Sequence, residues 1–530
     1  MIITLELHKV EELASAQQKI YVLSVSRITL KDDDANQKKG NDIHDISNFQ
    51  TSNRLSFPIT CQYTNEVDDQ KRTTAAINTR LKAALQTGNQ KLILRKWKQG
   101  ARWWNLNMNH TDLSSSNDTP VSNNTLSMAR AEVAGYRLAK LAMDHSQQQS
   151  TKKIRACIPE VLYFSHDEND SDDEPWALFS YFNVGELIEG FQVGNEGASN
   201  INIVHNLDLK FHPNGIATPE ITHLSSKPPS HCVECKHYPS TMTKIRHEFG
   251  FDEPHPRHGR VPIDECLDYA QMILQDVVLP IQLSFFEWSA SSSLPSFENT
   301  TEWTGSICEL AVCSQSKKPF QYHDMINVYK LALMRLSAAL EKEKADETMK
   351  SLLQMMKQCL EALENEWDDY NDCLPPSLPA VVCHMDLQPQ NLTFWREEVG
   401  SKSDDEKIHV SKQCNVASVV DFEEAAYADP RFEVLLICRK VLANLEQAKE
   451  LWESYSSSVK SHTPFDVGPI EPWLRLETVH SLFTLLLQAN NLLGGGRNPW
   501  ETKPDLWGKI DRERRRLVTM GWSFCIVNDH

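Results

Sequence analysis

The sequence predicts an α+β protein with two lobes, a small β-rich lobe at the N-terminal end and an enlarged, mostly helical lobe after it. Two patterns carry this prediction: strand-like apolar runs gather in residues 91–182, and long runs with helical spacing fill most of residues 263–522. A chain of 530 residues is long enough to build a core in each lobe. The expected boundaries are 1–185 and 186–530, with no element assigned before about residue 46.

The first lobe is predicted from one strand, one helix and two further strands. Lys91–Trp97, KLILRKW, is a compact apolar strand that carries two adjacent cations. Met128–His145 has apolar residues at helical spacing, and short apolar strands follow at Pro159–Phe164 and Trp176–Phe182. The run Asn183–Gly185 is typical of a connector, so the second lobe is expected to begin after it.

A hairpin is expected ahead of these strands, in Ile46–Tyr63, with its turn at Gln50–Asn53. This segment contains no glycine. At the turn, Ser52 and Asn53 would present a hydroxyl, an amide and backbone N–H groups, which are donors suited to a bound phosphate.

The second lobe is expected to be mostly helical, with a polar insertion around 190–262 near its start. Helical spacing or composition predicts helices at Ile263–Trp288, His323–Glu347, Met349–Trp367, Arg431–Tyr455, Pro472–Leu493 and Asp505–Trp522. Within the insertion, Cys232 and Cys235 form a C-x-x-C pair beside histidines, but no second ligand pair follows at standard spacing. A polar loop with reduced thiols is therefore favoured over a zinc site.

The most informative pattern joins three short strands of the second lobe. Val381–Trp395, VVCHMDLQPQNLTFW, indicates a strand, a polar loop and a second strand. Val419–Glu424, VVDFEE, indicates a third strand that ends in an acidic loop. The first loop holds the spacing H-x-D-x-x-x-x-N, and the third strand ends in an Asp-Phe pair. Polar loops at the ends of scaffold strands are where catalytic groups are expected.

This spacing matches the needs of phosphoryl transfer, in which a protein mainly positions the reactants and neutralises charge. One carboxylate orients the attacking hydroxyl, and Asp386 fits this role. Hard oxygen ligands hold Mg²⁺ on the nucleotide phosphates, and Asn391 with Asp421 fits that role. His384 is a further catalytic candidate, although such a histidine more often bonds the backbone and shapes the loop. The pattern predicts an ATP- and Mg²⁺-dependent kinase.

A cation on the first-lobe strand is expected to bind phosphate oxygens and to be held by an acid on the following helix. The candidates are Arg95 and Lys96, and alternation along a strand prevents both from facing the same side. Arg95 is slightly favoured. Glu132, in the first turns of the predicted helix, is the candidate acid, with an exposed helix position as an equal alternative.

These residues resemble the aminoglycoside phosphotransferase and choline kinase-like family. The resemblance rests on HMDLQPQNLTFW, on VVDFEEAAYADPRFEVLLI and on the LILR strand with its following helix. It covers about residues 46–185 and 375–455. It implies a two-lobed protein-kinase-like fold, ATP and Mg²⁺ as cofactors, and phosphorylation of a hydroxyl on a small molecule.

The resemblance also assigns roles and shows departures. By analogy, Tyr181 and Asn183 would contact adenine through the backbone of the connector between the lobes, and Arg95 would be the phosphate-binding cation. Met385 stands where the family usually has glycine. The expected phosphate-covering hairpin lacks glycine, and the strand offers arginine rather than lysine.

Composition narrows the function class further. The formal net charge of −18 argues against nonspecific nucleic-acid binding, which needs clustered Lys and Arg. The 13 cysteines are scattered without a regular framework, which favours a reduced, cytoplasmic setting. We expect no membrane association, because no apolar run approaches membrane-spanning length and no secretory leader is evident. The sequence does not indicate an oligomeric state.

Two alternative functions remain at this stage. A protein kinase is disfavoured because no lysine stands two residues after Asp386 and no Asp-Phe-Gly triplet occurs at the acidic loop. A catalytically weak kinase-like binding module is favoured by the glycine-poor hairpin and opposed by the intact set of Asp386, Asn391 and Asp421. Aminoglycosides, choline-like amines, amino alcohols and sugars all stay open as substrates.

Overall fold

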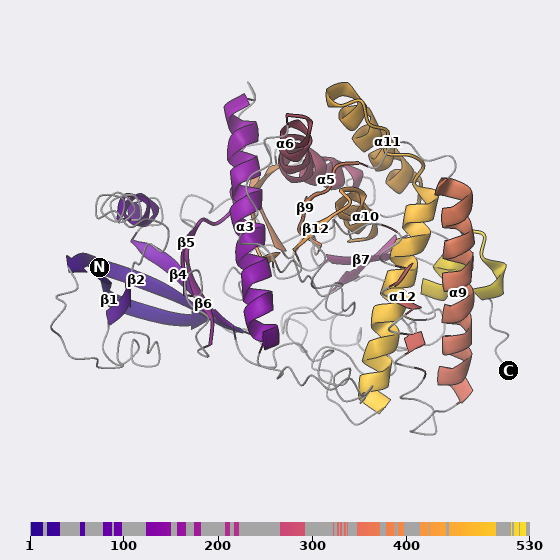
Figure 1. Cartoon of the computed structure of the whole chain (residues 1–530), viewed down its shortest axis with the longest axis horizontal. Coiled ribbons are helices and arrows are strands. Elements are labelled where there is room, and N and C mark those ends of the chain that lie inside the picture. Colours follow the sequence, from indigo (N-terminus) through magenta and orange to yellow (C-terminus); the bar gives the residue numbers. More distant parts are fainter. Residues whose placement is uncertain are drawn as a thin grey trace, which may run out of the picture. The chain divides into compact units, whose positions relative to one another are not determined.

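The computed structural model describes residues 2–13, 18–31, 54–58, 78–86, 90–97, 123–149, 156–165, 174–181, 207–211, 217–221, 266–291, 322, 326–327, 329–330, 333–334, 337, 347–371, 378–385, 387, 391–396, 414–422, 425–440, 442, 445–493, 510, 513–518 and 520–525. Within these residues the fold is α+β, as the sequence predicts (Figure 1).

The described residues fall into two compact units. The first, called the sheet unit, comprises those within Met1–Arg102, Asn117–Arg137 and Pro159–Ile188. The second, called the helical unit, comprises those within Leu138–Ile158 and Glu189–His530. Helix α3 (Asn123–Gln149) is longer than the predicted Met128–His145, and it supplies its first part to the sheet unit and its second part to the helical unit.

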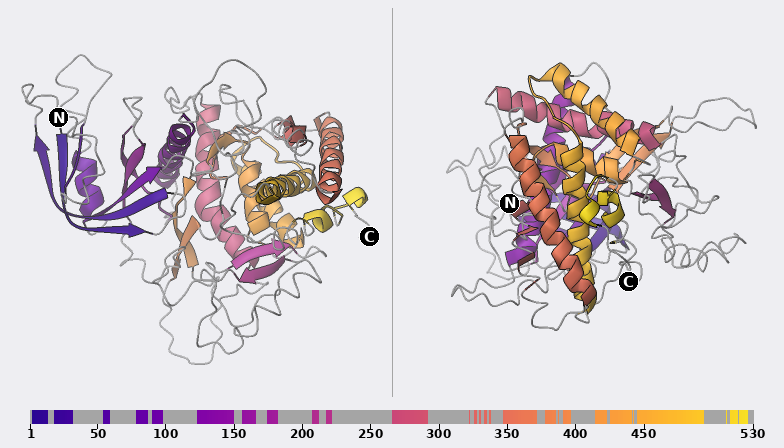
Figure 2. Two further views of the ribbon diagram at one scale, coloured as in Figure 1. Left: turned by 90° about the horizontal axis from the view of Figure 1, so that it is seen from below. Right: turned by 90° about the vertical axis from the view of Figure 1, so that its right-hand side faces the viewer.

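The sheet unit is built on a six-stranded antiparallel sheet with the strand order β3-β1-β2-β4-β6-β5. Its strands are β1 (Ile2–Leu13), β2 (Gln18–Lys31), β3 (Arg54–Pro58), β4 (Lys91–Trp97), β5 (Val161–Phe164) and β6 (Trp176–Ser180). Figure 2 shows the long first strands, in indigo, curving along the sheet. Strand β4 pairs with β2 on one side and β6 on the other, so both of its edges are hydrogen-bonded.

The core of the sheet unit follows from period-two alternation. Successive side chains of a strand point to opposite faces, and alternate residues of β1 are apolar and buried, whereas β2 is buried continuously over Tyr21–Val25. Strands β4 and β6 and a helical segment at 78–86 add apolar residues to the same cluster. The members from β1, β2 and this helix are Ile3, Leu5, Leu7, Tyr21, Leu23, Val25, Leu81, Ala84 and Leu85.

The start of the chain holds two strands that the sequence alone does not assign. The region before about residue 46 has no element assigned from the sequence, and β1 and β2 lie there. In β1, polar residues such as Thr4 and Glu6 alternate with buried apolar residues, as in a strand with one buried face. Strand β3, which follows Gln50–Asn53, pairs with β1 and has no other partner among the described strands. The rest of the predicted hairpin, including its turn at Gln50–Asn53, lies outside the described residues.

The helical unit has long helices that pack side by side. Its elements are α5 (Cys266–Ile273), the π-helical segment η5 (Leu274–Val278), α6 (Leu279–Ala290), α9 (Glu347–Asn371), α10 (Arg431–Lys440), α11 (Leu445–His462), α12 (Glu471–Leu493) and the 3₁₀ turn η9 (Ser523–Cys525). Helices α9 and α12 lie side by side in Figures 1 and 2. They confirm the helices predicted at Met349–Trp367 and Pro472–Leu493.

The single helix predicted at Arg431–Tyr455 is wrong, because the chain forms two helices there, α10 and α11. These two helices pack against each other. Both bury apolar residues, so the apolar spacing continues through the break, and periodicity alone carries no mark of a change in direction.

Short strands frame the loops of the helical unit. Strand β9 (Val381–Cys383) pairs antiparallel with β12 (Ala426–Ala428), and β10 (Leu392–Arg396) pairs antiparallel with β11 (Cys414–Val419). The three strands predicted around the polar loops are therefore confirmed as β9, β10 and β11. The predicted polar insertion contains an antiparallel pair of strands that was not expected from the sequence, β7 (Leu207–Phe211) and β8 (Ala217–Ile221).

Two further features of the described part are its lack of a membrane-spanning helix and its free cysteines. None of its helices combines the length and the apolar character needed to cross a bilayer. Five of its cysteines are free thiols: Cys157, Cys359, Cys383, Cys438 and Cys525. Cys232 and Cys235 lie outside the described residues.

Candidate functional site

The ladder between β10 and β11 brings Asn391 next to Asp421. Leu392 pairs with Val419 at the end of this ladder, and the Val420 N–H donates to the Asn391 carbonyl at 3.0 Å. Antiparallel pairing thus sets Asn391 opposite Val420, one residue before Asp421. Asp421 has φ of 70°, a left-handed conformation that Asp adopts more readily than most residues. A carboxylate and a carboxamide, both oxygen ligands, are therefore held on adjacent strand ends.

His384 ties the first polar loop to the acidic loop. Its Nε2 lies 2.8 Å from the Val420 carbonyl, and because a carbonyl only accepts, Nε2 carries the proton. The ring packs on Phe422 with 4.4 Å between centroids and is 3% exposed. Burial lowers the pKa of His384, which favours the neutral imidazole. This bonded, buried ring suits the loop-shaping role rather than proton transfer.

Glu433, in the first turn of α10, holds the residue after His384. The Met385 N–H donates to Glu433 Oε1 at 2.8 Å, and Met385 has φ of 62°. Burial raises the pKa of Glu433 to about 7, although hydrogen bonds from the backbone of Met385 and His384 act in the opposite direction. Glu433 is a residue that the sequence analysis missed.

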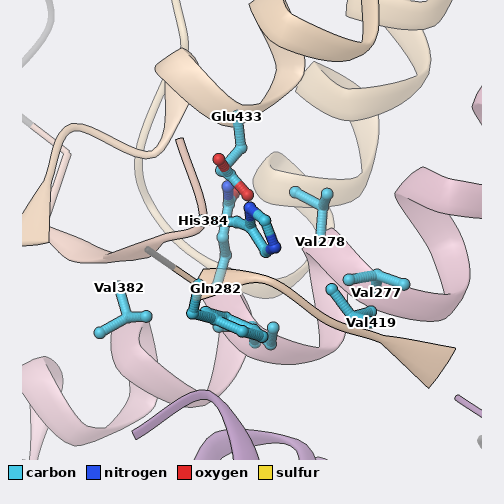
Figure 3. A pocket seen from close by; sticks show the side chains of 9 residues that line it. Val277, Val278, Gln282, Val382, His384, Val419 and Glu433 are labelled. Atoms are coloured by element: carbon cyan, nitrogen blue, oxygen red, sulfur yellow. The ribbon is translucent and has the colours of Figure 1, made fainter. Parts of the chain in front are cut away.

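Glu433 and His384 line a small, mostly apolar cavity behind the polar loop. Figure 3 shows the Glu433 carboxyl group and the His384 ring pointing toward each other, with Val277 and Val278 of the π-helical segment beside them. The remaining lining residues are Ile281, Gln282, Val382, Val419 and Phe422. A carboxyl group in such surroundings is expensive to desolvate, which accounts for its raised pKa.

The π-helical segment also fixes β11. Asp276 lies within η5 and is 9% exposed, and its Oδ2 accepts a hydrogen bond from the Val416 N–H at 3.1 Å. Single-turn π segments inside α-helices are frequent at functional sites. Asp276 is the second contributor that the sequence analysis missed. Asp276 and Glu433 are each a single acid within an otherwise apolar run of the sequence. That is the only local sequence feature that points to a role for either residue.

In the sheet unit, Arg95 and Glu132 form a buried ion pair. Arg95 Nη1 contacts Glu132 Oε1, and the Trp97 indole N–H donates to Glu132 Oε2 at 2.8 Å. Glu132 is fully buried and Arg95 nearly so. The Arg95 guanidinium also lies 5.7 Å from the Trp97 ring centroid. The structure therefore joins the two residues that the sequence analysis expected to pair.

Lys96 takes the other side of β4. By alternation it shares a face with Leu92 and Leu94 of the core cluster, and its Nζ pairs with Glu174 Oε2 at 2.8 Å near the surface. Tyr181 lies just after β6, with the Lys91 Nζ 5.4 Å from its ring centroid. Lys96 and Tyr181 are therefore separate from the Arg95–Glu132 pair.

Several candidate residues lie outside the described part of the chain. Asp386, the proposed hydroxyl-orienting carboxylate, falls between the described residues Met385 and Leu387, and Leu387 is fully buried. Ser52, Asn53 and Asn183 are also outside it. What the structure brings together is His384, Asn391 and Asp421 in the helical unit and Arg95 with Glu132 in the sheet unit.

No protein-family model and no curated protein sequence matches the chain. Solved structures do. The chain is similar to an aminoglycoside phosphotransferase in complex with GDP and kanamycin, at 11% identity and a TM-score of 0.34, over 81% of this chain and 87% of that one. A second similar structure is a putative aminoglycoside phosphotransferase from Ralstonia eutropha, at 9% identity and a TM-score of 0.36, over 98% and 94%.

A third is a choline/ethanolamine kinase family protein from Mesorhizobium loti, at 11% identity and a TM-score of 0.30, over 82% and 84%. The solved structures that the chain resembles are aminoglycoside phosphotransferases and a choline/ethanolamine kinase family protein, which are the proteins that its motifs resemble.

Proposed function

We propose that this protein is an ATP- and Mg²⁺-dependent phosphotransferase that acts on a hydroxyl group of a small molecule. The observation that carries the proposal is the hydrogen bond from the Val420 N–H to the Asn391 carbonyl, which sets Asn391 and Asp421 side by side. Asp386, in the same loop as Asn391, is proposed to orient the attacking hydroxyl and to accept its proton.

The donor set in the helical unit fits Mg²⁺. Asp421 and Asn391 offer a carboxylate and an amide oxygen, and Mg²⁺ prefers such hard oxygen ligands. No group of three or more His, Cys, Asp or Glu side chains suited to a metal occurs in the described part of the chain. Mg²⁺ commonly takes one or two protein ligands and completes its shell with phosphates and water. When bound, Mg²⁺ would neutralise charge on the nucleotide phosphates.

In the sheet unit, Arg95 is proposed to bind nucleotide phosphate, with Glu132 holding its guanidinium in place. A guanidinium has five N–H donors, so pairing with one carboxylate oxygen does not exhaust its capacity. The pairing of Lys96 with Glu174 favours Arg95 over Lys96 for this role. Tyr181 and Asn183 are proposed to contact adenine, and Ser52 and Asn53 remain proposed phosphate contacts.

For the substrate and the cellular compartment we propose only a class. The proposed acceptor is a hydroxyl-bearing small molecule, with aminoglycosides, amino alcohols, choline-like amines and sugars all compatible. The free, buried thiols of Cys359, Cys383 and Cys438 are compatible with a reduced compartment, and we propose the cytoplasm.

Mg²⁺-dependent nucleotide binding tests this proposal without a known acceptor. Calorimetric titration of ADP into the full chain, with and without Mg²⁺, should show tighter binding with the metal. Asp421→Asn should weaken the Mg²⁺-dependent part by about tenfold or more, since it replaces a charged carboxylate ligand with a neutral amide. Asp268→Asn, an exposed change on α5, is the matched control and should leave it unchanged. ADP binding in the wild type that is indifferent to Mg²⁺ would contradict the proposal.

A further inference from the structure

Two thiols of the helical unit face each other, although they stand 166 residues apart in the chain. Cys359 lies on α9 and Cys525 ends the 3₁₀ turn η9, and their sulfur atoms are 3.9 Å apart. Both side chains are buried, with exposed fractions of 0% for Cys359 and 1% for Cys525. The buried thiols of Cys383 and Cys438 contact backbone carbonyls instead. The fold therefore holds the sulfurs of Cys359 and Cys525 in direct contact.

The described residues of 510–525, called the 510–525 segment, are fixed to two long helices. Arg516 of this segment pairs with Glu477 of α12 at 3.1 Å, and both side chains are buried. Arg475 of α12 donates to a backbone carbonyl of the segment at 3.1 Å. Figure 2 shows the segment in yellow beside α9, against which η9 packs. The contact between the two sulfurs therefore does not depend on η9 alone.

A disulfide between Cys359 and Cys525 needs only a small movement. An S–S bond is about 2.05 Å long, so the sulfurs must approach by about 1.9 Å from their separation of 3.9 Å. Rotation about the Cα–Cβ bond of either cysteine moves its sulfur by a distance of this order. The turn η9 is three residues long and has the poorer hydrogen-bond geometry of a 3₁₀ helix, so it opens more readily than an α-helix. Opening admits a small oxidant to the buried sulfurs.

The two sulfurs differ in ionisation. The hydrogen bond with Cys525 and burial raise the pKa of Cys359, so this thiol keeps its proton. The hydrogen bond from Cys359 lowers the pKa of Cys525, and the positive charge of Arg514 acts in the same direction, against the effect of burial. Arg514 Nη2 also donates to the Cys525 carbonyl at 3.4 Å. Because the thiolate is the nucleophile, Cys525 is the sulfur that reacts first.

We infer that Cys359 and Cys525 form a redox-sensitive pair, which hydrogen peroxide converts to a disulfide that locks the 510–525 segment onto α9. Disulfides of cytosolic proteins, where they occur, are usually transient and serve catalysis or redox sensing. A reversible bond therefore suits the reduced compartment that we propose. Neither cysteine is among the proposed kinase residues, so the pair is independent of the proposed function.

The oxidation proceeds in two steps. The Cys525 thiolate attacks one oxygen of hydrogen peroxide, so that an S–O bond forms and the O–O bond breaks. The hydroxide that leaves takes a proton from solvent and becomes water. The Cys359 sulfur then attacks the Cys525 sulfur, so that the S–S bond forms and the S–O bond breaks. The second hydroxide takes the Cys359 proton and leaves as water. The two cysteines together lose two electrons, and the peroxide gains them.

Peptide mapping of the oxidised full chain is the first test. The reduced protein is treated with hydrogen peroxide until the exposed thiol of Cys157 no longer reacts with an alkylating agent. The remaining thiols are alkylated in denaturant. Digestion with trypsin and a glutamate-specific protease cuts after Glu361, which separates Cys359 from Cys373. Mass spectrometry should find the peptides of Cys359 and Cys525 joined, lighter than their sum by the hydrogens of both thiols, and separate again after reduction.

Two results would overturn the inference. One is full alkylation of both Cys359 and Cys525 at that dose of peroxide, and the other is oxidation of Cys525 to a sulfinic acid while Cys359 stays a thiol. Cys157→Ser is the matched control, treated with the dose fixed for the wild type, and the joined peptides should form in it equally. Their absence from Cys157→Ser would show that the exposed thiol makes the bond by exchange, which also contradicts the direct reaction.

Arg514→Gln tests the order of attack. This change removes a charge that favours the Cys525 thiolate, so the joined peptides should appear about two- to tenfold more slowly. Arg515→Gln removes the same charge at the neighbouring position and should leave the rate close to that of the wild type. Equal rates in the two variants would contradict the assignment of Cys525 as the first sulfur to react.

Amide hydrogen exchange measures what the bond does to the fold. Peptides that cover residues 513–525 should exchange about tenfold more slowly after oxidation, because a covalent link to α9 opposes opening of the segment. Cys525→Ala, which cannot form the bond, should show no change in exchange with peroxide. If exchange is unchanged in oxidised wild type that contains the joined peptides, the bond does not lock the segment and that part of the inference is overturned.

Discussion

Glu132 illustrates how a buried charge shapes the sheet unit. Its side chain is fully buried, and its two oxygens meet the Arg95 guanidinium and the Trp97 indole N–H. Removing both charges and filling the space is often neutral, whereas removing one leaves the other buried without its partner. The pair is therefore a strong constraint on single substitutions, whatever its net contribution to stability.

Arg95→Met should lower the free energy of unfolding by about 3–5 kcal/mol, because Glu132 loses its cation. Lys96→Met is the matched control on the same strand, and it should cost about 0–1 kcal/mol, since the Lys96–Glu174 pair is near the surface. Urea denaturation of the full chain, followed by tryptophan fluorescence, measures both. Equal, small losses in the two variants would show that the Arg95–Glu132 pair is not the constraint described.

Glu433 should make stability depend on pH. Its pKa is about 7 in the folded chain against 4.5 when unperturbed, so the folded state keeps a proton that the unfolded state has released between these values. The contribution of Glu433 to stability is therefore greatest below about pH 4.5 and is lost as the pH rises through about 7. The difference of 2.5 units corresponds to about 3 kcal/mol at most.

The comparison of wild type with Glu433→Gln isolates this effect from the other carboxyl groups. The wild type should lose stability relative to Glu433→Gln as the pH is raised from 5 to 8, as measured by urea denaturation at each pH. A stability difference between the two that is constant over this range would contradict the raised pKa.

At the scale of elements, the ends of β9, β10 and β11 carry the candidate site, and α10 and η5 hold these strand ends. Asp276 of η5 accepts the Val416 N–H, and Glu433 of α10 accepts the Met385 N–H. Both carboxylates accept hydrogen bonds from backbone N–H groups, those of Val416 and Met385. The loops are thus fixed by side chains from helices as well as by their own ladders.

Asp276→Leu should lower the free energy of unfolding by about 1–3 kcal/mol, because it leaves the Val416 N–H without its acceptor. Asp276→Asn keeps an oxygen at the same place and should cost less. Faster amide exchange in residues 414–419 should accompany the loss in Asp276→Leu. If Asp276→Leu is as stable as the wild type, η5 does not hold β11 in the way described.

The sequence predicts those features that depend on neighbouring residues in the chain. His384, Asn391 and Asp421 were identifiable because short apolar strands directly flank them, and the structure confirms those strands. Glu433 and Asp276 were not, because their partners lie 48 and 140 residues away in the chain. Strand alternation predicts that Arg95 and Lys96 point to opposite faces of β4. Which of the two is buried in an ion pair depends on the position of Glu132 on α3.

The first strands were missed for a different reason. Strand β1 alternates Ile3, Leu5 and Leu7 with polar residues, which is the pattern of a half-buried strand. The polar residues of β1 include glutamates, which are depleted in strands, so the composition of β1 is not typical of a strand. Which strands pair is a long-range property: β3 pairs with β1 from the start of the chain, and no local turn predicts that.

At the scale of the whole molecule, the central claim is that the chain transfers phosphate from ATP to a small-molecule hydroxyl through Asp386. The two units supply different proposed parts, with a phosphate-binding cation in one and metal ligands in the other. Neither unit alone contains the full set of proposed groups. The claim is therefore tested on the full chain.

The most direct measurement is ADP release from Mg²⁺-ATP across a panel of aminoglycosides, amino alcohols, choline-like amines and sugars, for the wild type and Asp386→Asn. ADP release should depend on the compound and should fall by about 10²–10⁴-fold in Asp386→Asn, as loss of a general base implies. Transfer of labelled phosphate to proteins but to no compound would favour the protein-kinase alternative. Compound-dependent release that is equal in Asp386→Asn and the wild type would contradict the central claim.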